Sequence, residues 1–183
     1  MRIDRDRSFL LIVDMQEKLV PAVQDHEHVV ANAARLMTGA ARLEVPILVT
    51  EHYPRGIGHT VPALRELAPA NAVLEKIHFC AVAEPDCERR LAALRRPQAV
   101  VAGTEAHVCV LQTVLGLADA GYETYVVIDA VSSRKPADKE AAIARLHDAG
   151  TAGVTTEMVL FEWLARGDTE AFRDLLPLIK SAS

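Results

Sequence analysis

The sequence predicts an α/β fold in which helices flank a six-stranded parallel sheet on both sides, forming a three-layer domain over residues 1–183. Apolar runs of strand length alternate with stretches of helical period, which is typical of strand–helix–strand units around a parallel sheet. These runs are almost wholly apolar, as expected for strands covered on both faces. The chain has the length of one domain and contains no linker, repeat or low-complexity stretch. The predicted strands span residues 9–13, 47–50, 72–75, 99–103, 125–128 and 153–155.

Helices are predicted between these strands from the spacing of apolar residues and from the residues at helix ends. Asp25 precedes a helix whose apolar face recurs from Val29 to Leu43, so we expect Asp25 to cap that helix. Pro85 suits the first turn of another helix, which reaches residue 94. The remaining predicted elements are helices over residues 109–120 and 137–149 that stop at glycines, one or two amphipathic helices within residues 158–179, and one long loop over residues 52–62.

The composition is that of a globular protein, because half of the residues are hydrophobic and a quarter are charged. No apolar run approaches the ~20 residues of a membrane-spanning helix, and the charged residues 1–7 lack the features of a secretory signal. A net charge of −5 without a lysine or arginine cluster argues against nucleic acid and anionic lipid as partners. Three cysteines without regular spacing give no disulfide framework. We therefore expect a soluble cytoplasmic protein with a small-molecule substrate and no nucleic-acid or membrane partner.

Three polar residues lie where predicted strands end. Asp14 closes the first strand, Lys76 follows the third, and Cys109 lies beyond the fourth strand at the start of a helix. Ligands of an open parallel sheet bind beyond the carboxyl ends of the strands, because loops and helix N-termini converge there. We therefore expect the three side chains to meet in one cleft.

Cys109 has the setting of a nucleophile. Unsatisfied backbone N–H groups and the helix dipole at a helix N-terminus lower the pKa of a thiol and favour the thiolate. The same amides can stabilise the oxyanion that forms when a thiolate adds to a carbonyl. The alternative is a buried cysteine that packs as a small hydrophobic residue, which is our interpretation of Cys80 and Cys87.

Asp14 and Lys76 are suited to act on that thiol. A carboxylate at the end of an apolar strand must be solvated, paired or shifted in its ionisation, and a general base fits this setting. Lys76 could hold Asp14 ionised and stabilise developing negative charge. Each residue alone has a simpler explanation, because aspartate is common in turns and a lysine at a strand end is usually solvated. It is the combination with Cys109 that favours a catalytic centre.

Three motifs extend over nearly the whole chain: LIVDMQ at residues 11–16, Lys76 in the middle, and GTEAHVCV at residues 103–110 before a helix. In these motifs the sequence resembles the isochorismatase-like cysteine hydrolases, a family that includes nicotinamidases and N-carbamoylsarcosine amidase. The segments TEHYP at residues 50–54, TVP at 60–62 and DAVSSR at 129–134 are similar to the isochorismatase-domain-containing branch of animals and bacteria. That branch has no settled substrate.

The resemblance implies a role for each residue of the combination. Asp14 would be the general base, Lys76 its cationic partner and Cys109 the nucleophile. It also implies a cis peptide bond between Thr104 and Glu105, which would direct the backbone amides of Glu105 and Cys109 at the oxyanion. Non-proline cis bonds cost about 3 kcal/mol and are expected only where they shape a site.

The resemblance to nicotinamidases does not extend to their metal cluster of aspartate and histidine side chains. His52 and His59 lie in the corresponding loop, but Thr50 occupies the carboxylate position and no third histidine fits. We therefore expect no bound metal, and the proposed chemistry needs no organic cofactor. Isochorismatases of siderophore synthesis typically lack the cysteine, so Cys109 argues against that activity. The positions predicted to wall a substrate pocket, each of which could equally be rim or packing, are His52, Tyr53, His78 and His107.

The leading hypothesis is an amidase-type hydrolase that acts on a small carbonyl compound through a covalent thioester on Cys109. The alternative is a non-hydrolytic protein in which Cys109 is a redox-sensitive thiol or the pocket only binds a metabolite. Retention of a base, a cation and a nucleophile together favours the enzyme. Small apolar helix residues and the amphipathic tail also predict a homo-oligomer, which is compatible with either function.

Overall fold

A six-stranded parallel sheet in the order β3-β2-β1-β4-β5-β6 forms the centre of the computed structural model, which describes residues 2–180. Its strands are β1 (Ser8–Val13), β2 (Ile47–His52), β3 (Val73–Lys76), β4 (Gln98–Thr104), β5 (Glu123–Ser132) and β6 (Ala152–Val154). Every neighbouring pair of strands runs parallel. The predicted fold class is confirmed, and each predicted strand matches an observed one, although β5 continues to Ser132 beyond its predicted end.

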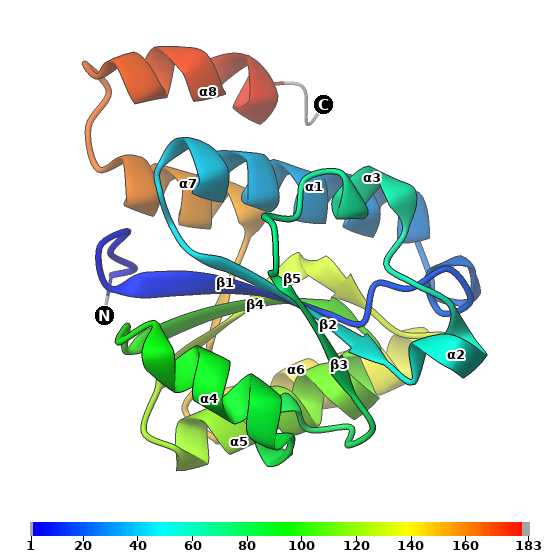
Figure 1. Cartoon of the computed structure of the whole chain (residues 1–183). Coiled ribbons are helices and arrows are strands. Elements are labelled where there is room, and N and C mark those ends of the chain that lie inside the picture. The colour runs from blue at the N-terminus through cyan, green and yellow to red at the C-terminus, as the bar shows by residue number, and fades with distance from the viewer. Residues whose placement is uncertain (1, 181–183) are drawn as a thin grey trace.

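Helices cover both faces of this sheet (Figure 1). One face carries α1 (His26–Arg42), α3 (Pro62–Arg65) and α7 (Thr156–Leu164), while α8 (Glu170–Lys180) lies outside α1 and α7. The other face carries α4 (Pro85–Ala93), α5 (Leu111–Asp119) and α6 (Pro136–Asp148). The shorter elements are α2 (Pro54–Ile57) and the turns η1 (Val20–Ala22), η2 (Ala81–Ala83) and η3 (Ala106–Val110). No helix among residues 2–180 is long and apolar enough to cross a membrane.

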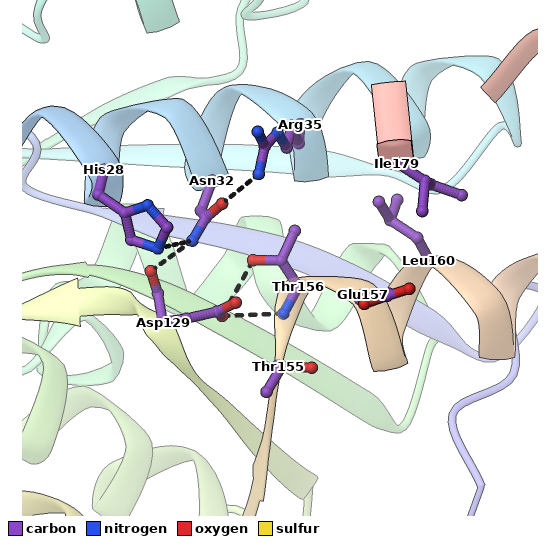
Figure 2. Close-up of a pocket in the computed structure, with 9 residues that line it drawn as sticks. All are labelled: His28, Asn32, Arg35, Asp129, Thr155, Thr156, Glu157, Leu160 and Ile179. Atoms are coloured by element: carbon purple, nitrogen blue, oxygen red, sulfur yellow. Dashed lines mark hydrogen bonds between the residues drawn. The ribbon is translucent and has the colours of Figure 1, made fainter. Parts of the chain in front are cut away.

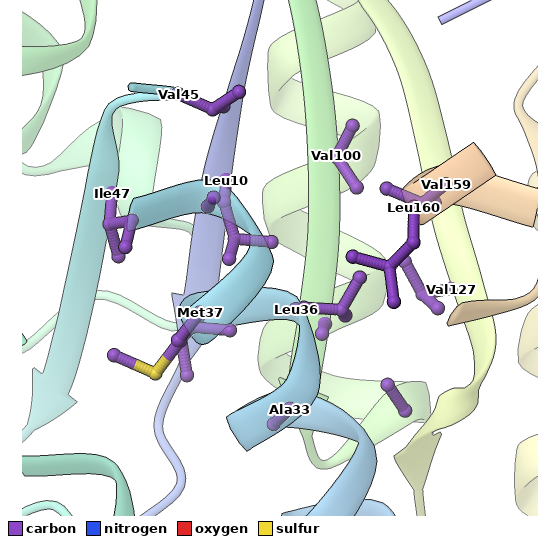
Figure 3. Close-up of a cluster of buried hydrophobic side chains, with 14 of the residues drawn as sticks. Leu10, Ala33, Leu36, Met37, Val45, Ile47, Val100, Val127, Val159 and Leu160 are labelled. Atoms are coloured by element: carbon purple, nitrogen blue, oxygen red, sulfur yellow. The ribbon is translucent and has the colours of Figure 1, made fainter. Parts of the chain in front are cut away.

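Side chains alternate between the two faces of each strand, which gives the domain two hydrophobic cores. In β1, Leu10 and Ile12 join the core beneath α1, while Leu11 joins the core beneath α5. Figure 3 shows Leu36 and Met37 of α1 lying over β1 and β4. Full burial of one such side chain contributes about 1.5–3 kcal/mol. The apolar runs that predicted the strands therefore also hold the sheet between its two helix layers.

Three local expectations were wrong. The predicted loop over residues 52–62 contains α2 and the start of α3, because Pro54 and Pro62 each occupy a first-turn position where proline is favourable. Asp25 precedes α1 but makes no side-chain capping bond, since its backbone is left-handed with φ of 51° rather than extended. The helix predicted to start at Cys109 is preceded by the π-helical turn η3, so Cys109 lies inside that turn.

The order of the strands places a topological switch point between β1 and β4. The chain passes from β1 outward through β2 and β3, and then crosses to β4 on the other side of β1. Connections on the two sides of such a switch point lead away from each other and leave a crevice beyond the strand ends. Asp14 follows β1 and Thr104 ends β4, so both residues lie at this switch point, where a parallel sheet of this kind binds its ligands.

Gly103 allows β4 to approach β1 closely at the crevice. Its φ is 141°, and a Cβ there would lie 2.1 Å from the carbonyl oxygen of Val13. Because the obstacle is the backbone of the neighbouring strand, we expect Gly103→Ala to lower the free energy of unfolding by about 3 kcal/mol or more, as measured by urea denaturation. Gly150→Ala is the control, because φ is 88° but nothing lies within 4 Å of an added Cβ. It should cost only about 1–2 kcal/mol, and equal losses at both positions would contradict the explanation.

Candidate active site

Asp14 is completely buried at the crevice and is fixed by the strands on both sides of β1. Its backbone is left-handed, with φ of 50°. From β2, Thr50 accepts the Asp14 N–H at 3.1 Å and donates its hydroxyl to Asp14 Oδ1 at 2.7 Å. From β4, the Thr104 hydroxyl donates to the Asp14 carbonyl at 2.7 Å. Neighbouring strands therefore set both the backbone and the carboxylate of Asp14.

Lys76 ends β3 and reaches across β2 to Asp14. The Lys76 Nζ lies 2.6 Å from Asp14 Oδ2, and both side chains are 0% exposed. The same Nζ donates to the backbone carbonyls of His78 and Phe79, at 3.2 Å each. A buried ammonium needs such partners, since an unpaired charge away from water costs several kcal/mol. Lys76 and Asp14 therefore form a buried ion pair.

Cys109 lies within η3 and presents its thiol to this ion pair. The residue is 5% exposed, and its thiol lies near enough to Asp14 and Lys76 that both residues affect its pKa. Burial, followed by the negative charge of Asp14, raises the pKa of the Cys109 thiol well above its usual range, although Lys76 partly opposes the shift. The expectation of a lowered pKa was therefore wrong, because burial and the charge of Asp14 raise it. At neutral pH the site holds a thiol beside a carboxylate.

The junction between β4 and η3 is tied to the loop after β5. The peptide bond between Thr104 and Glu105 is cis. The Glu105 carboxylate pairs with Arg134, with 2.7 Å between Oε1 and Nε. His107 Nδ1 lies 2.9 Å from the hydroxyl of Ser133 in the same loop. The sequence analysis did not predict the ion pair between Glu105 and Arg134. These residues follow β4 and β5, which are neighbours in the sheet, so the strand order could have indicated that they lie close together.

His52 lies next to the ion pair. It is the register partner of Lys76 between β2 and β3, and its ring stacks on Phe79 at a centroid distance of 5.2 Å. Burial, and then the charge of Lys76, lower the pKa of His52. Its Nδ1 is buried without a hydrogen-bond partner among residues 2–180. A neutral imidazole therefore stands beside the Asp14–Lys76 pair.

Tyr53 and His78 are more exposed than His52. Tyr53 is half-exposed and lines a cavity of about 270 Å³ that also touches Lys76. His78 contributes its carbonyl to Lys76, but its ring is 58% exposed and its Nδ1 lies 3.0 Å from Glu84. Of the four predicted pocket residues, His52 lies beside the Asp14–Lys76 pair, while His78 contributes its backbone carbonyl to Lys76.

Glu51 is a buried carboxylate next to His52 that the sequence analysis did not consider. It accepts hydrogen bonds from Thr60 N at 2.7 Å, Thr60 Oγ1 at 2.8 Å and His59 Nδ1 at 2.9 Å. Burial raises the pKa of Glu51, but these bonds outweigh it and the net shift is downward. Its oxygens therefore serve to tie the segment after β2 to the sheet. Within residues 2–180, no group of three or more His, Cys, Asp or Glu side chains could hold a metal ion.

A separate cavity of about 260 Å³ lies between α1, β5 and α7, on the opposite face of the sheet from Cys109 (Figure 2). At its wall, the buried Asn32 donates to the Asp129 carbonyl at 2.8 Å and accepts from Arg35 at 2.9 Å. The Asp129 carboxylate accepts from the backbone and hydroxyl of Thr156. These polar groups bond one another and join α1 and α7 to β5 beside a register shift in its pairing with β4. None of the three predicted catalytic residues lines this cavity.

A parallel sheet whose central crevice gathers an aspartate, a lysine and a cysteine has the architecture of a hydrolase-like α/β protein. The family model described as "Isochorismatase domain" matches residues 8–158, and the chain belongs to this family. It is 36% identical over 174 residues to "Isochorismatase domain-containing protein 1" of Danio rerio, covering 94% of this chain and 61% of that protein. The chain thus spans about three fifths of that relative's length. The mouse "Isochorismatase domain-containing protein 2B" is 34% identical over 180 residues, which cover 98% of this chain and 84% of that protein.

Solved structures share the whole fold. The "MAR1 Ribonuclease" from Caenorhabditis elegans has a TM-score of 0.93 and 34% identity, covering 100% of this chain and 95% of that one. YcaC from Pseudomonas aeruginosa, solved with hexane-2,5-diol and covalent acrylamide, has a TM-score of 0.92 and 27% identity, covering 99% and 93%. The YcaC gene product from Escherichia coli, described as an octameric hydrolase of unknown specificity, has a TM-score of 0.93 and 24% identity, covering 100% and 90%.

Proposed function

We propose that this chain is a cysteine hydrolase that cleaves a small amide-like or related carbonyl compound, with Cys109, Asp14 and Lys76 as its catalytic residues. The observation that carries the proposal is the burial of the Cys109 thiol beside the Asp14–Lys76 ion pair at the switch point of the sheet. A buried ion pair contributes little net stability, because desolvation offsets its attraction. A nucleophile, a base and a cation gathered at the ligand-binding edge of the sheet are better explained by chemistry.

The first half of the reaction forms a thioester. Because burial raises the pKa of the Cys109 thiol, the thiol has to lose its proton as it attacks, and Asp14 is the base that accepts it. Sγ bonds to the carbonyl carbon, and the carbonyl oxygen becomes an oxyanion. We assign the backbone N–H groups of Glu105 and Cys109 as donors to that oxyanion. Lys76 holds Asp14 in place and offsets negative charge throughout.

The second half releases the two products. The oxyanion collapses, the bond from carbon to the leaving amine breaks, and the amine takes the proton from Asp14. Water then attacks the thioester and gives a proton to Asp14, the bond between carbon and Sγ breaks, and the acid leaves. Asp14 returns the proton to Sγ, so the site ends as it began. These steps use neither a metal nor an organic cofactor.

The proposed substrate is a small molecule, and we propose a pocket for it near the thiol. We assign His52, Tyr53, His78 and His107 to its walls or rim. Their mixture of rings and polar groups suits a small molecule, and the net charge of −5 is unfavourable for RNA. We also propose a homo-oligomer, since the similar Escherichia coli protein is described as octameric.

A redox-sensing or purely ligand-binding role is the competing proposal. Redox-sensor thiols are accessible and have a low pKa, because the thiolate is the species that oxidants attack. The Cys109 thiol is buried and its pKa is raised, which favours the hydrolase. A ligand-binding role would need neither a base nor a nucleophile.

The test combines an activity screen with acrylamide as a covalent probe of cysteine. The chain is incubated with a panel of small amides, carbamoyl compounds and esters, with RNA included, and products are measured alongside intact mass. We expect hydrolysis of at least one carbonyl compound, and a single acrylamide adduct that maps to Cys109. Cys80→Ser is the matched control, because this thiol is partly exposed and lies outside the site, so the adduct should persist. Cleavage of RNA without any carbonyl hydrolysis, or an adduct on another cysteine, would overturn the proposal.

A further inference from the structure

Thr50 contacts Asp14 at both its backbone and its side chain. Thr50 lies opposite Val13 in the β1–β2 register, so its carbonyl accepts the N–H of Asp14 at 3.1 Å. Its hydroxyl donates to Asp14 Oδ1 at 2.7 Å, while Lys76 holds Oδ2 at 2.6 Å. Thr50 and Lys76 thus divide the two carboxylate oxygens between them.

The hydroxyl of Thr50 is not explained by packing. Thr50 is 0% exposed, and a valine has nearly the same shape without a polar atom that must find a partner. A hydroxyl that donates to a carboxylate stabilises its ionised form more than its protonated form. The Thr50 hydroxyl is therefore placed to affect when Asp14 can accept a proton, as well as where its oxygens lie.

We propose that Thr50 is a positioning residue for the base, which orients the Asp14 carboxylate and extends to lower pH the range in which it can deprotonate Cys109. This inference rests on the proposed function, because it requires Asp14 to act on the Cys109 thiol. Thr50 would act on the reaction only through Asp14 and would not contact the substrate.

A test of this proposal has to distinguish Asp14 from the other titratable groups that face it. They are Lys76 from β3, His52 from β2, Cys109 from η3 and Cys87 from α4. Burial raises the pKa of Cys87 to about 11, so Cys87 stays neutral through the acidic range. Burial and then Lys76 lower the pKa of His52, so His52 also has to be separated from Asp14 in a pH profile.

The experiment measures the rate of Cys109 alkylation by iodoacetamide between about pH 4 and pH 8, read by peptide mass spectrometry. In wild type the rate should fall towards low pH as Asp14 becomes protonated. Thr50→Val should move this fall to higher pH by about one unit, which is about tenfold in rate at any pH below both midpoints. Thr50→Ser keeps the hydroxyl and should restore the wild-type midpoint. In a His52→Gln background, Thr50→Val should move the fall by the same amount, because the shift comes from the bond to Asp14 and not from the imidazole.

Matched variants make the result decisive. Thr38→Val makes the same change in α1, where the hydroxyl donates to the Ala34 carbonyl at 2.9 Å, and should leave the profile unmoved. If Thr50→Val loses stability without moving the midpoint, or if Thr50→Ser behaves like Thr50→Val, the inference is overturned and Thr50 is structural. If Asp14→Asn alkylates with the wild-type profile, the proposed function itself fails. Failure of the Thr50 inference and failure of the proposed function can therefore be told apart in the same experiment.

Discussion

Cys109→Ala should abolish turnover, by at least about 10⁴-fold, and should remove every covalent adduct, because no other side chain at that position can attack a carbonyl. The fold should survive, since the change removes one small buried sulfur and costs only about 1 kcal/mol. Initial rates on the substrate found by screening, together with intact mass after acid quench, measure both effects. Circular dichroism checks that the variant is folded.

Cys109→Ser tests whether the lost turnover depends on the thiol itself. The serine hydroxyl keeps the position of the nucleophile but holds its proton far more tightly than a thiol, so we expect residual turnover well below wild type and above the alanine variant. Cys87→Ser is the control for loss of a buried thiol, since the raised pKa of Cys87 makes that thiol inert. Turnover retained in Cys109→Ala would contradict covalent catalysis at this residue.

Asp14→Asn and Lys76→Met should each lower turnover by about 10²–10⁴-fold and each destabilise the fold by about 3–5 kcal/mol. Each single change leaves one charge buried without its partner, since both side chains of the pair are 0% exposed. Urea denaturation measures the loss of stability and kcat/KM measures the loss of function.

The double variant Asp14→Asn with Lys76→Met separates these two effects. Without either charge, the buried site no longer holds an unpaired ion, so much of the lost stability should return. Turnover should stay as low as in the worse single variant, because residues that act as a unit give non-additive losses. A double variant as unstable as the sum of the single ones would show that the pair does not behave as a buried ion pair.

The sequence was sufficient for the fold and for the three residues at its crevice. Strands such as β1 are apolar throughout, and this local property reports that both faces are covered. Asp14, Lys76 and Cys109 could be found because each lies at or beyond the end of a strand and all parallel strands end at the same edge. The helical turn at Pro54 was missed although the proline was a local signal for it, because proline also occurs in loops. The left-handed backbone of Asp25 had no such signal in the sequence.

The most consequential wrong prediction was that the pKa of the Cys109 thiol is lowered. A helix N-terminus alone lowers the pKa of a cysteine, and this is all that the spacing of Cys109 from the preceding strand reveals. The structure buries Cys109 against Asp14, which raises the pKa instead. Desolvation and a facing carboxylate depend on elements far apart in the chain, so no local pattern reports them.

The sequence by itself determined the three-layer fold and the polar residues at its strand ends, because hydrophobic periodicity and strand termini can be recognised from consecutive residues. Only the tertiary structure decided how these ends meet. It joined Lys76 to Asp14 across β2, and it set the hydroxyls of Thr50 and Thr104 on opposite sides of Asp14. These hydrogen bonds link residues up to 90 positions apart, and they form because strand order and register, rather than sequence separation, determine which groups lie within bonding distance.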